Sequence, residues 1–287
     1  MTYRDGDFIF HFPFFHFQLS HGAALVRLND DMAHVPTQLS ALLQELVERL
    51  PVIVGHNLVG IYLYGSVTHE AFNPKRSDVD LIVVTGRDLS DAQFRKLDVW
   101  LARSAESNPW TARLQMSLLI KKEILTMNSK GCLYQFGRLS RRGSDGNPII
   151  WRDFLKSGKV LFGPRPESFL PAITPEIFFQ ALEREIGYLR EEISCKPESE
   201  WRDVPMYRAY AVLTVCRILY SFLKGPIVSK PTAARWAIKS LPEEWREIIV
   251  QALEFNDANR KSDISLMRIE QFIDFADAQL HPLNSKN

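Results

Sequence analysis

Leu63-Tyr64-Gly65-Ser66 closes one apolar run of this chain, and Asp78-Val79-Asp80 opens the next apolar run. Residues two apart on a strand project to the same face, so Asp78 and Asp80 can both reach one hard cation. Aspartate carboxylates hold Mg²⁺, which keeps its other positions for water and substrate phosphates. The stretch therefore predicts a metal site at the edge of a sheet.

Gly65 and Ser66 add what a phosphate group needs. Gly65 has no side chain and lets a phosphate approach the backbone. Ser66 brings a hydroxyl to a point where a helix can begin, with free N–H groups facing an anion. Ser77 is a further polar contact in this prediction. A metal beside a triphosphate suits nucleotidyl transfer to a hydroxyl, which needs charge on the phosphates to be neutralised. The competing interpretation is a turn with strand-end carboxylates facing solvent.

Composition sets loose limits on partners and compartment. The 287 residues, of which 46% are hydrophobic and 24% charged, are typical of a soluble globular protein with one or two domains. A formal net charge of +1 argues against nucleic acid or an acidic membrane as the main partner. The three cysteines are widely spaced, which fits a reducing cytoplasm. No apolar run reaches the ~18 residues of a membrane helix, so we expect a cytoplasmic protein, and a monomer is compatible with the sequence.

The elements around the motif predict a small mixed α/β sheet. Leucines at helical spacing predict a helix from about residue 39 that Pro51 breaks. Ser90 and Gln93 form a capping box that opens a helix to about Ala105. The expected strands are residues 58–64, 80–85 and 113–120, with a last short strand and a linker over 158–166.

Beyond residue 166 the pattern becomes helical. Thr174-Pro175-Glu176 supplies an N-cap, a proline at the first helical position and an acid in the first turn. The expected helices are residues 174–193, 206–224, 233–238, 243–255 and 266–280. The expected fold class is therefore α+β, a small mixed-sheet domain followed by an α-helical bundle domain. Its proposed divisions are an N-terminal arm over 1–31, a sheet domain over 32–166 and a helical domain over 167–287.

The arm is unusual because phenylalanine dominates residues 8–17. We interpret it as an apolar arm that packs on the domain or as residues outside the natural product, since Met32 begins a more ordinary N-terminus. An aromatic surface for a partner is the functional alternative.

Several stretches of the chain resemble the aminoglycoside adenylyltransferases that modify streptomycin and spectinomycin. Tyr64–Ser66 and Phe72–Leu81 look like the core motif of that family, and Leu161–Pro164 looks like its interdomain stretch. Val212–Tyr220 and Ser229–Ala237 are similar to its helical domain. The resemblance covers roughly residues 32–281. It implies a polymerase-β-like nucleotidyltransferase domain and a helical domain, with ATP and Mg²⁺ in the cleft between them.

The resemblance also implies roles for individual residues. Ser66 and Ser77 would contact phosphates, Asp78 and Asp80 would bind the metal, and two cations of the helical domain, Arg217 and Lys230, would reach the triphosphate. Without the family, Arg217 on an apolar helix still needs an anionic partner, which a buried structural ion pair would equally provide. Lys230 at a helix start could equally be a solvated cation.

Gln115 departs from the family pattern. The family carries a glutamate on the strand after Asp-x-Asp, as general base or third carboxylate, and Gln115 falls at that position. A glutamine cannot accept the proton of the acceptor hydroxyl at neutral pH, and general-base help is typically ~10²–10⁴-fold. Another acid such as Glu123 could substitute, chemistry could proceed slowly with two aspartates, or the protein could bind nucleotide without turnover.

The residues expected to contact the acceptor also differ from the family pattern. Arg208 lies near positions where the family has an acid and a histidine, and Leu139 replaces an aromatic residue. Streptomycin is a polycation, so these changes argue against it as the physiological acceptor. The function we expect is transfer of AMP from Mg-ATP to a hydroxyl of an aminoglycoside-like small molecule, with release of pyrophosphate. The alternatives are a nucleotide-binding protein with weakened or lost catalysis and an adenylyltransferase that modifies proteins.

Overall fold

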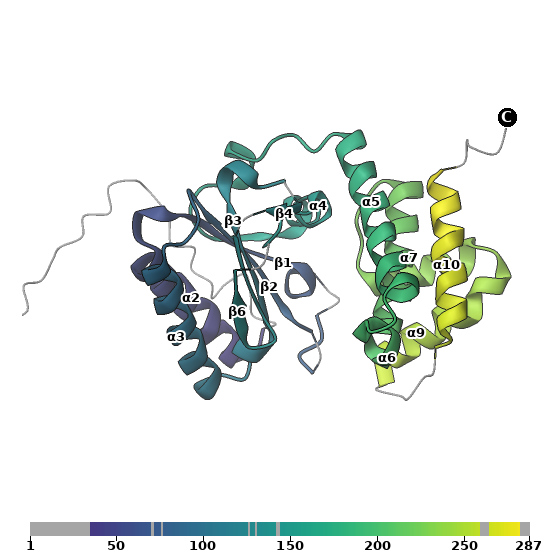
Figure 1. Cartoon of the computed structure of the whole chain (residues 1–287), viewed down its shortest axis with the longest axis horizontal. Helices are drawn as coiled ribbons and strands as arrows, with labels where there is room; N and C mark the ends of the chain where they lie inside the picture. The colour runs from purple at the N-terminus through teal and green to yellow at the C-terminus, as the bar shows by residue number, and fades with distance from the viewer. Residues whose placement is uncertain are drawn as a thin grey trace, which may run out of the picture.

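The computed structural model describes residues 35–69, 72–75, 77–125, 127–129, 131–141, 144–258 and 264–281. Figure 1 shows a half built on a β-sheet beside a half built from helices. The fold is thus the expected α+β arrangement. The predictions for the N-terminal arm and for Met32 lie outside the described residues.

A six-stranded mixed sheet organises the first half. Its strands are β1 (Leu58–Tyr64), β2 (Val79–Thr85), β3 (Leu114–Ile120), β5 (Gly131–Gln135), β6 (Arg138–Ser140) and β8 (Lys159–Phe162). They lie in the order β6-β5-β3-β2-β1-β8. The β2–β3 pair is parallel and the other pairs are antiparallel. A separate two-stranded ladder joins β4 (Met127–Ser129) to β7 (Ser144–Asp145).

Each face of the sheet packs against different helices. The helices α2 (Thr37–Val54) and α3 (Asp91–Ser107) cover one face, and α4 (Pro148–Ser157) covers the other, as Figure 1 shows. Alternate residues of β2 therefore enter different cores: Leu81 and Val83 face α2 and α3, whereas Ile82 and Val84 lie with Trp151 of α4. This alternation places Asp80 on the α4 face.

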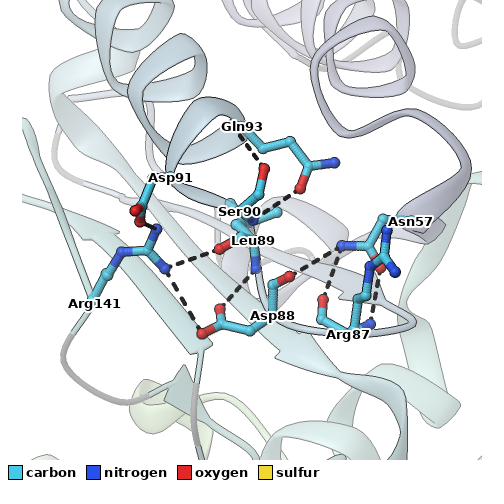
Figure 2. Close-up of polar contacts among 8 residues, drawn as sticks. All are labelled: Asn57, Arg87, Asp88, Leu89, Ser90, Asp91, Gln93 and Arg141. Carbon is cyan, nitrogen blue, oxygen red and sulfur yellow. Dashed lines mark hydrogen bonds and ion pairs between the residues drawn. The ribbon is translucent and has the colours of Figure 1, made fainter.

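The start of α3 carries the predicted capping box (Figure 2). Ser90 Oγ accepts a hydrogen bond from the Gln93 N–H at 3.3 Å, and Gln93 Oε1 accepts one from the Ser90 N–H at 3.0 Å. Arg141 donates to the Leu89 carbonyl at 3.0 Å and to the Asp91 carboxylate at 2.8 Å. These bonds fix the end of β2 that is farthest from Asp80.

The second half is an α-helical bundle with its own core, made mainly of α5, α7, α8, α9 and α10. Its helices are α5 (Pro175–Arg190), α6 (Glu200–Asp203), α7 (Pro205–Lys224), α8 (Lys230–Ser240), α9 (Arg246–Ala258) and α10 (Leu266–Leu280). Thr174 caps α5 by accepting from the Ile177 N–H, as predicted. Gly225, at φ +92°, ends α7.

The predicted C-terminal end of the first helix, α2, was wrong. Pro51 does not break α2, which continues to Val54 with the proline in its last turn. The ring removes one N–H donor, and the helix ends three residues later, so the loss affects a single turn. In the part of the chain that the structure describes, no helix combines the length and apolar character needed to span a membrane.

Candidate active site

The two aspartates of the opening motif lie at the edge of the sheet where β1 ends and β2 begins. Tyr64, the last residue of β1, pairs with Asp80 in β2, and Asp78 directly precedes β2. Gly65–Thr68 forms a short 3₁₀ turn, η2, immediately after β1. The helix expected to begin at Ser66 is only this 3₁₀ turn of 4 residues, which lies beside the two carboxylates.

Gly65 is essential to that juxtaposition. Its backbone is left-handed, with φ +73°. A Cβ atom at this position would lie 2.2 Å from Oδ2 of Asp80. The absence of a side chain thus lets the turn approach the Asp80 carboxylate, in addition to the phosphate approach that the sequence suggested.

The carboxylates are held in a partly dehydrated environment. Burial, followed by the nearby charge of Asp78, raises the pKa of Asp80 to about 7. Dehydration also raises the pKa of Asp78, although the positive charges of Arg113 and Lys230 act in the opposite direction. Two acids with raised pKa values at one sheet edge are a favourable pair for a divalent cation, because the cation would neutralise both.

Two cations of the helical half face this pair. Arg217 on α7 is half-buried, and among the described residues its guanidinium makes no hydrogen bond and no ion pair within 4.0 Å, although its charge acts on Glu185 and Asp80. Lys230 begins α8, and its Nζ lies 3.5 Å from the ring centre of Tyr210. Burial, followed by the charge of Arg217, lowers the pKa of Lys230 to about 7. Two partly buried cations, one of which lowers the pKa of the other, indicate an anion site.

Glu185 was not anticipated. This α5 residue accepts a hydrogen bond from Asn147 Nδ2 at 3.4 Å. Burial raises its pKa, while the charges of Arg217 and Lys230 lower it. Helical spacing marked α5 as amphipathic, but no local signal connects Glu185 with cations thirty or more residues away.

Gln115 lies where the resemblance placed it. In the parallel pairing of β2 with β3, Asp80 is the partner of Gln115 and Thr85 is the partner of Ile120. Glu123 follows Ile120 at the opposite end of β3, about 16 Å or more along the strand from Gln115. The suggestion that Glu123 substitutes for the missing glutamate is therefore wrong.

Arg113 is a second residue that the sequence did not identify. Its guanidinium donates to the Pro74 carbonyl at 2.7 Å and to the Ser77 carbonyl, and it stacks 4.2 Å from the ring centre of Trp110. Ser77 Oγ in turn accepts from the Asn73 N–H at 2.9 Å. Arg113 thus shapes the loop before Asp78, and the Ser77 hydroxyl keeps its own hydrogen for a ligand.

Three aromatic side chains of the helical half, Trp201, Tyr207 and Tyr210, form a wall near Asp78. Trp201 stacks on Tyr207, with ring centres 5.5 Å apart, and meets Tyr210 edge to face at 5.5 Å. Tyr207 lies close enough to Asp78 for that charge to contribute, after burial and Glu200, to its raised pKa. The Arg208 guanidinium is held by backbone carbonyls. It donates to the Arg202 carbonyl at 2.5 Å and to the Ile264 carbonyl at 3.2 Å. These neutral carbonyls fix the position of the guanidinium and leave its positive charge in place.

The arrangement can hold a divalent cation and a polyanion side by side. Within the described ranges, no group of three or more His, Cys, Asp or Glu side chains forms a complete metal site. A cation held by Asp78 and Asp80 would thus take its remaining ligands from water or from a bound anion, as Mg²⁺ does.

The chain is similar to known adenylyltransferases. Residues 168–279 match the family model described as aminoglycoside adenylyltransferase, C-terminal domain. The spectinomycin 9-adenylyltransferase of Campylobacter jejuni is 22% identical over 225 residues, covering 73% of this chain and 82% of the relative. The aminoglycoside (3'')(9) adenylyltransferase of Rhizobium radiobacter is 24% identical over 267 residues, covering 86% and 94%.

A solved structure shares the fold. The crystal structure of spectinomycin adenyltransferase AAD(9) from Enterococcus faecialis with ATP and spectinomycin superposes with a TM-score of 0.64 at 18% sequence identity. The match covers 84% of this chain and 99% of that one, so it includes both the sheet and the helical half.

Proposed function

Because this chain belongs to the aminoglycoside adenylyltransferase family, we propose that it transfers AMP from ATP to a hydroxyl of an aminoglycoside-like small molecule, releasing pyrophosphate. The observation that carries this proposal is the charge arrangement of the site. Asp78 and Asp80 lie at the sheet edge, and two cations of the helical half share their electrostatic surroundings. A Mg²⁺–triphosphate would suit this arrangement, because the metal would neutralise the two carboxylates and the phosphates would neutralise the two cations.

Asp78 and Asp80 would hold Mg²⁺, which would neutralise charge on the phosphates as the α-phosphorus is attacked. Gly65 and Ser66 would bring backbone N–H groups and a hydroxyl to the phosphates, and the Ser77 hydroxyl would donate from the loop before Asp78. Arg217 and Lys230 would bind the triphosphate from the other side and stabilise the charge that develops on the leaving pyrophosphate.

The acceptor would lie against the wall formed by Trp201, Tyr207 and Tyr210. The faces of these rings can pack against the apolar face of a sugar or cyclitol ring. Gln115 can donate or accept a hydrogen bond and so orient the acceptor hydroxyl, but its amide cannot take the proton. We therefore expect transfer to be slower than in an enzyme with glutamate at this position.

Pyrophosphate release tests the proposal. Purified protein is mixed with Mg-ATP and either spectinomycin or streptomycin. We expect acceptor-dependent release with at least one of them, and no release by Asp78→Asn or Asp80→Asn. Tight ATP binding without release across aminoglycosides and other polyols would contradict the enzyme proposal.

The second candidate is a nucleotide-binding protein that has lost catalysis, which Gln115 beside Asp80 favours. The variant Gln115→Glu separates the two, because we expect it to raise the transfer rate about 10-fold or more. Gln44→Glu, at an exposed position of α2 on the face of the sheet opposite Asp80, is the matched control and should leave the rate unchanged. An unchanged rate in Gln115→Glu would argue for loss of catalysis at more than this position.

The third candidate modifies proteins. Labelled ATP added to a lysate would label a polypeptide if that candidate were correct, and failure to label any polypeptide would eliminate it.

We further propose that the protein acts in the cytoplasm as a monomer, without nucleic acid or membrane partners, which the near-neutral net charge supports.

A further inference from the structure

His69 connects the Ser66 turn to α4. Its backbone N–H donates to the Ser66 carbonyl at 3.1 Å, so the residue closes the turn. Its ring Nε2 lies 3.2 Å from Asp153 Oδ1 and 3.2 Å from Ser157 Oγ. Asp153 and Ser157 are one turn apart on α4, and only 20% of the His69 side chain and 13% of the Asp153 side chain are exposed. One ring thus joins two elements through a mostly buried contact.

The hydrogen-bond network fixes the orientation of that ring. The Ser157 hydroxyl donates to the Asp153 carbonyl at 3.3 Å, so its oxygen is available as an acceptor. A carboxylate is also an acceptor, which makes His69 Nε2 the donor to both groups. A ring held by two acceptors cannot turn without losing both bonds.

The adjacent flank of α4, about 100° around the helix, contacts the helical half. Lys156 Nζ donates to the Ile227 carbonyl at 2.6 Å, three residues before Lys230. The Arg152 guanidinium lies 3.9 Å from the ring centre of Phe178 on α5. Thus α4 touches the Ser66 turn with one flank and the segment that leads to Lys230 with the adjacent flank.

We propose that His69, Asp153 and Ser157 are positioning residues that hold the Ser66 turn at a set distance from the cations of the helical half. The inference rests on the proposed function, because a nucleotide that bridges the turn and the cations benefits only if both are correctly spaced. The three side chains need not touch the nucleotide. His69 and Ser157 act through α4, which links the two halves, whereas the charge of Asp153 also acts on Asp80.

Calorimetric titration with Mg-ATP tests the inference without requiring turnover. We expect His69→Ala and Asp153→Ala each to weaken ATP binding about 10-fold, as for loss of a hydrogen bond to a charged group. His69→Gln should restore binding to within about twofold, because an amide N–H can donate to Asp153. In steady-state assays the KM for ATP should rise more than kcat falls.

His281 provides the matched control. Its Nε2 contacts the Glu183 carboxylate at 2.5 Å in a similar pair at the end of α10. His281→Ala should leave the Kd for ATP unchanged. ATP affinity equal to wild type in both His69→Ala and Asp153→Ala would overturn the inference, and so would a His69→Gln variant as weak as His69→Ala. Failure of the proposed function would look different, since wild-type protein itself would then bind no ATP or release no pyrophosphate.

Discussion

At the scale of single residues, Gly65 determines how closely the turn and the metal ligands can approach. Its left-handed backbone and the 2.2 Å that would separate a Cβ from Asp80 both require glycine. The sequence singled out this residue for close phosphate approach, and that role stays a prediction. The contact with Asp80 could not be foreseen, because it depends on how β1 pairs with β2.

Gly65→Ala is therefore expected to displace the Asp80 carboxylate and lower the rate of AMP transfer by about 10²-fold or more. Gly137→Ala is the control, since Gly137 has a similar φ of +72° and no atom within 4 Å of its Cβ position. Both variants should lose about 1–2 kcal/mol of stability to left-handed strain, measured by urea unfolding. An equal loss of activity in both would contradict the role assigned to the Asp80 contact.

Burial of the charged Asp80 carboxylate lowers the stability of the folded protein. Its folded pKa of about 7 exceeds the ordinary aspartate value, so between about pH 4 and 7 the folded state binds the extra proton and loses stability as pH rises. We expect Asp80→Asn to stabilise the nucleotide-free protein by about 1–2 kcal/mol at pH 8 while abolishing transfer. The gain should shrink at pH 5. Equal gains at both pH values in urea unfolding would contradict this account.

At the residue level, the sequence indicated which residues lie together where they are close in the chain, and their roles stay predictions. Asp78, Asp80 and Gly65 lie within one strand–turn–strand unit, and Gln115 lies one strand away in simple parallel register. Arg113 and Glu185 were missed because they reach the site only through loop folding and helix packing. Spacing along the chain carries no signal for such contacts.

At the scale of elements, prediction succeeded where a boundary has its own chemistry. The capping box of α3, the Thr174 cap of α5 and the end of α7 at Lys224 are confirmed. The hairpin of β5 and β6 was missed, because its turn residues, Phe136 and Gly137, both adopt positive φ without an Asn-Gly or Asp-Gly signal.

The capping box of α3 gives a stability prediction. Ser90→Ala should lower the free energy of unfolding by about 1 kcal/mol, because the Gln93 N–H loses its acceptor. Transfer activity should remain, since α3 begins at the end of β2 opposite Asp80. Ser265→Ala is the matched control, because Ser265 is an N-cap residue without a side-chain cap bond, and it should cost less. Equal losses in chemical denaturation would show that the bond contributes nothing.

At the scale of the whole molecule, α4 belongs to both halves. Ile149 lies in the core of the helical half, whereas Trp151 and Phe154 lie in the core on the sheet. The division of the chain near residue 166 stays a prediction, and these contacts show that α4 links the cores on either side of it.

A ligand that bridges the halves should stabilise the whole molecule. At 100 times its Kd, Mg-ATP is expected to add about 2.7 kcal/mol to the free energy of unfolding. Arg217→Ala and Lys230→Ala should lose most of that increment, with little effect on the ligand-free protein. Lys239→Ala, near the exposed end of α8, is the control that should keep it. Thermal unfolding with and without Mg-ATP measures the difference, and a full increment in Arg217→Ala would contradict the assigned contact.

The register that sets Gln115 beside Asp80 also has an evolutionary consequence. Each glutamine codon becomes a glutamate codon by a single base substitution. Because the strand pairing already supplies the position, a third carboxylate needs no rearrangement of the backbone. A gene encoding this chain is thus one point mutation from a complete acidic set, and we expect antibiotic selection on cells that carry it to enrich that mutation early.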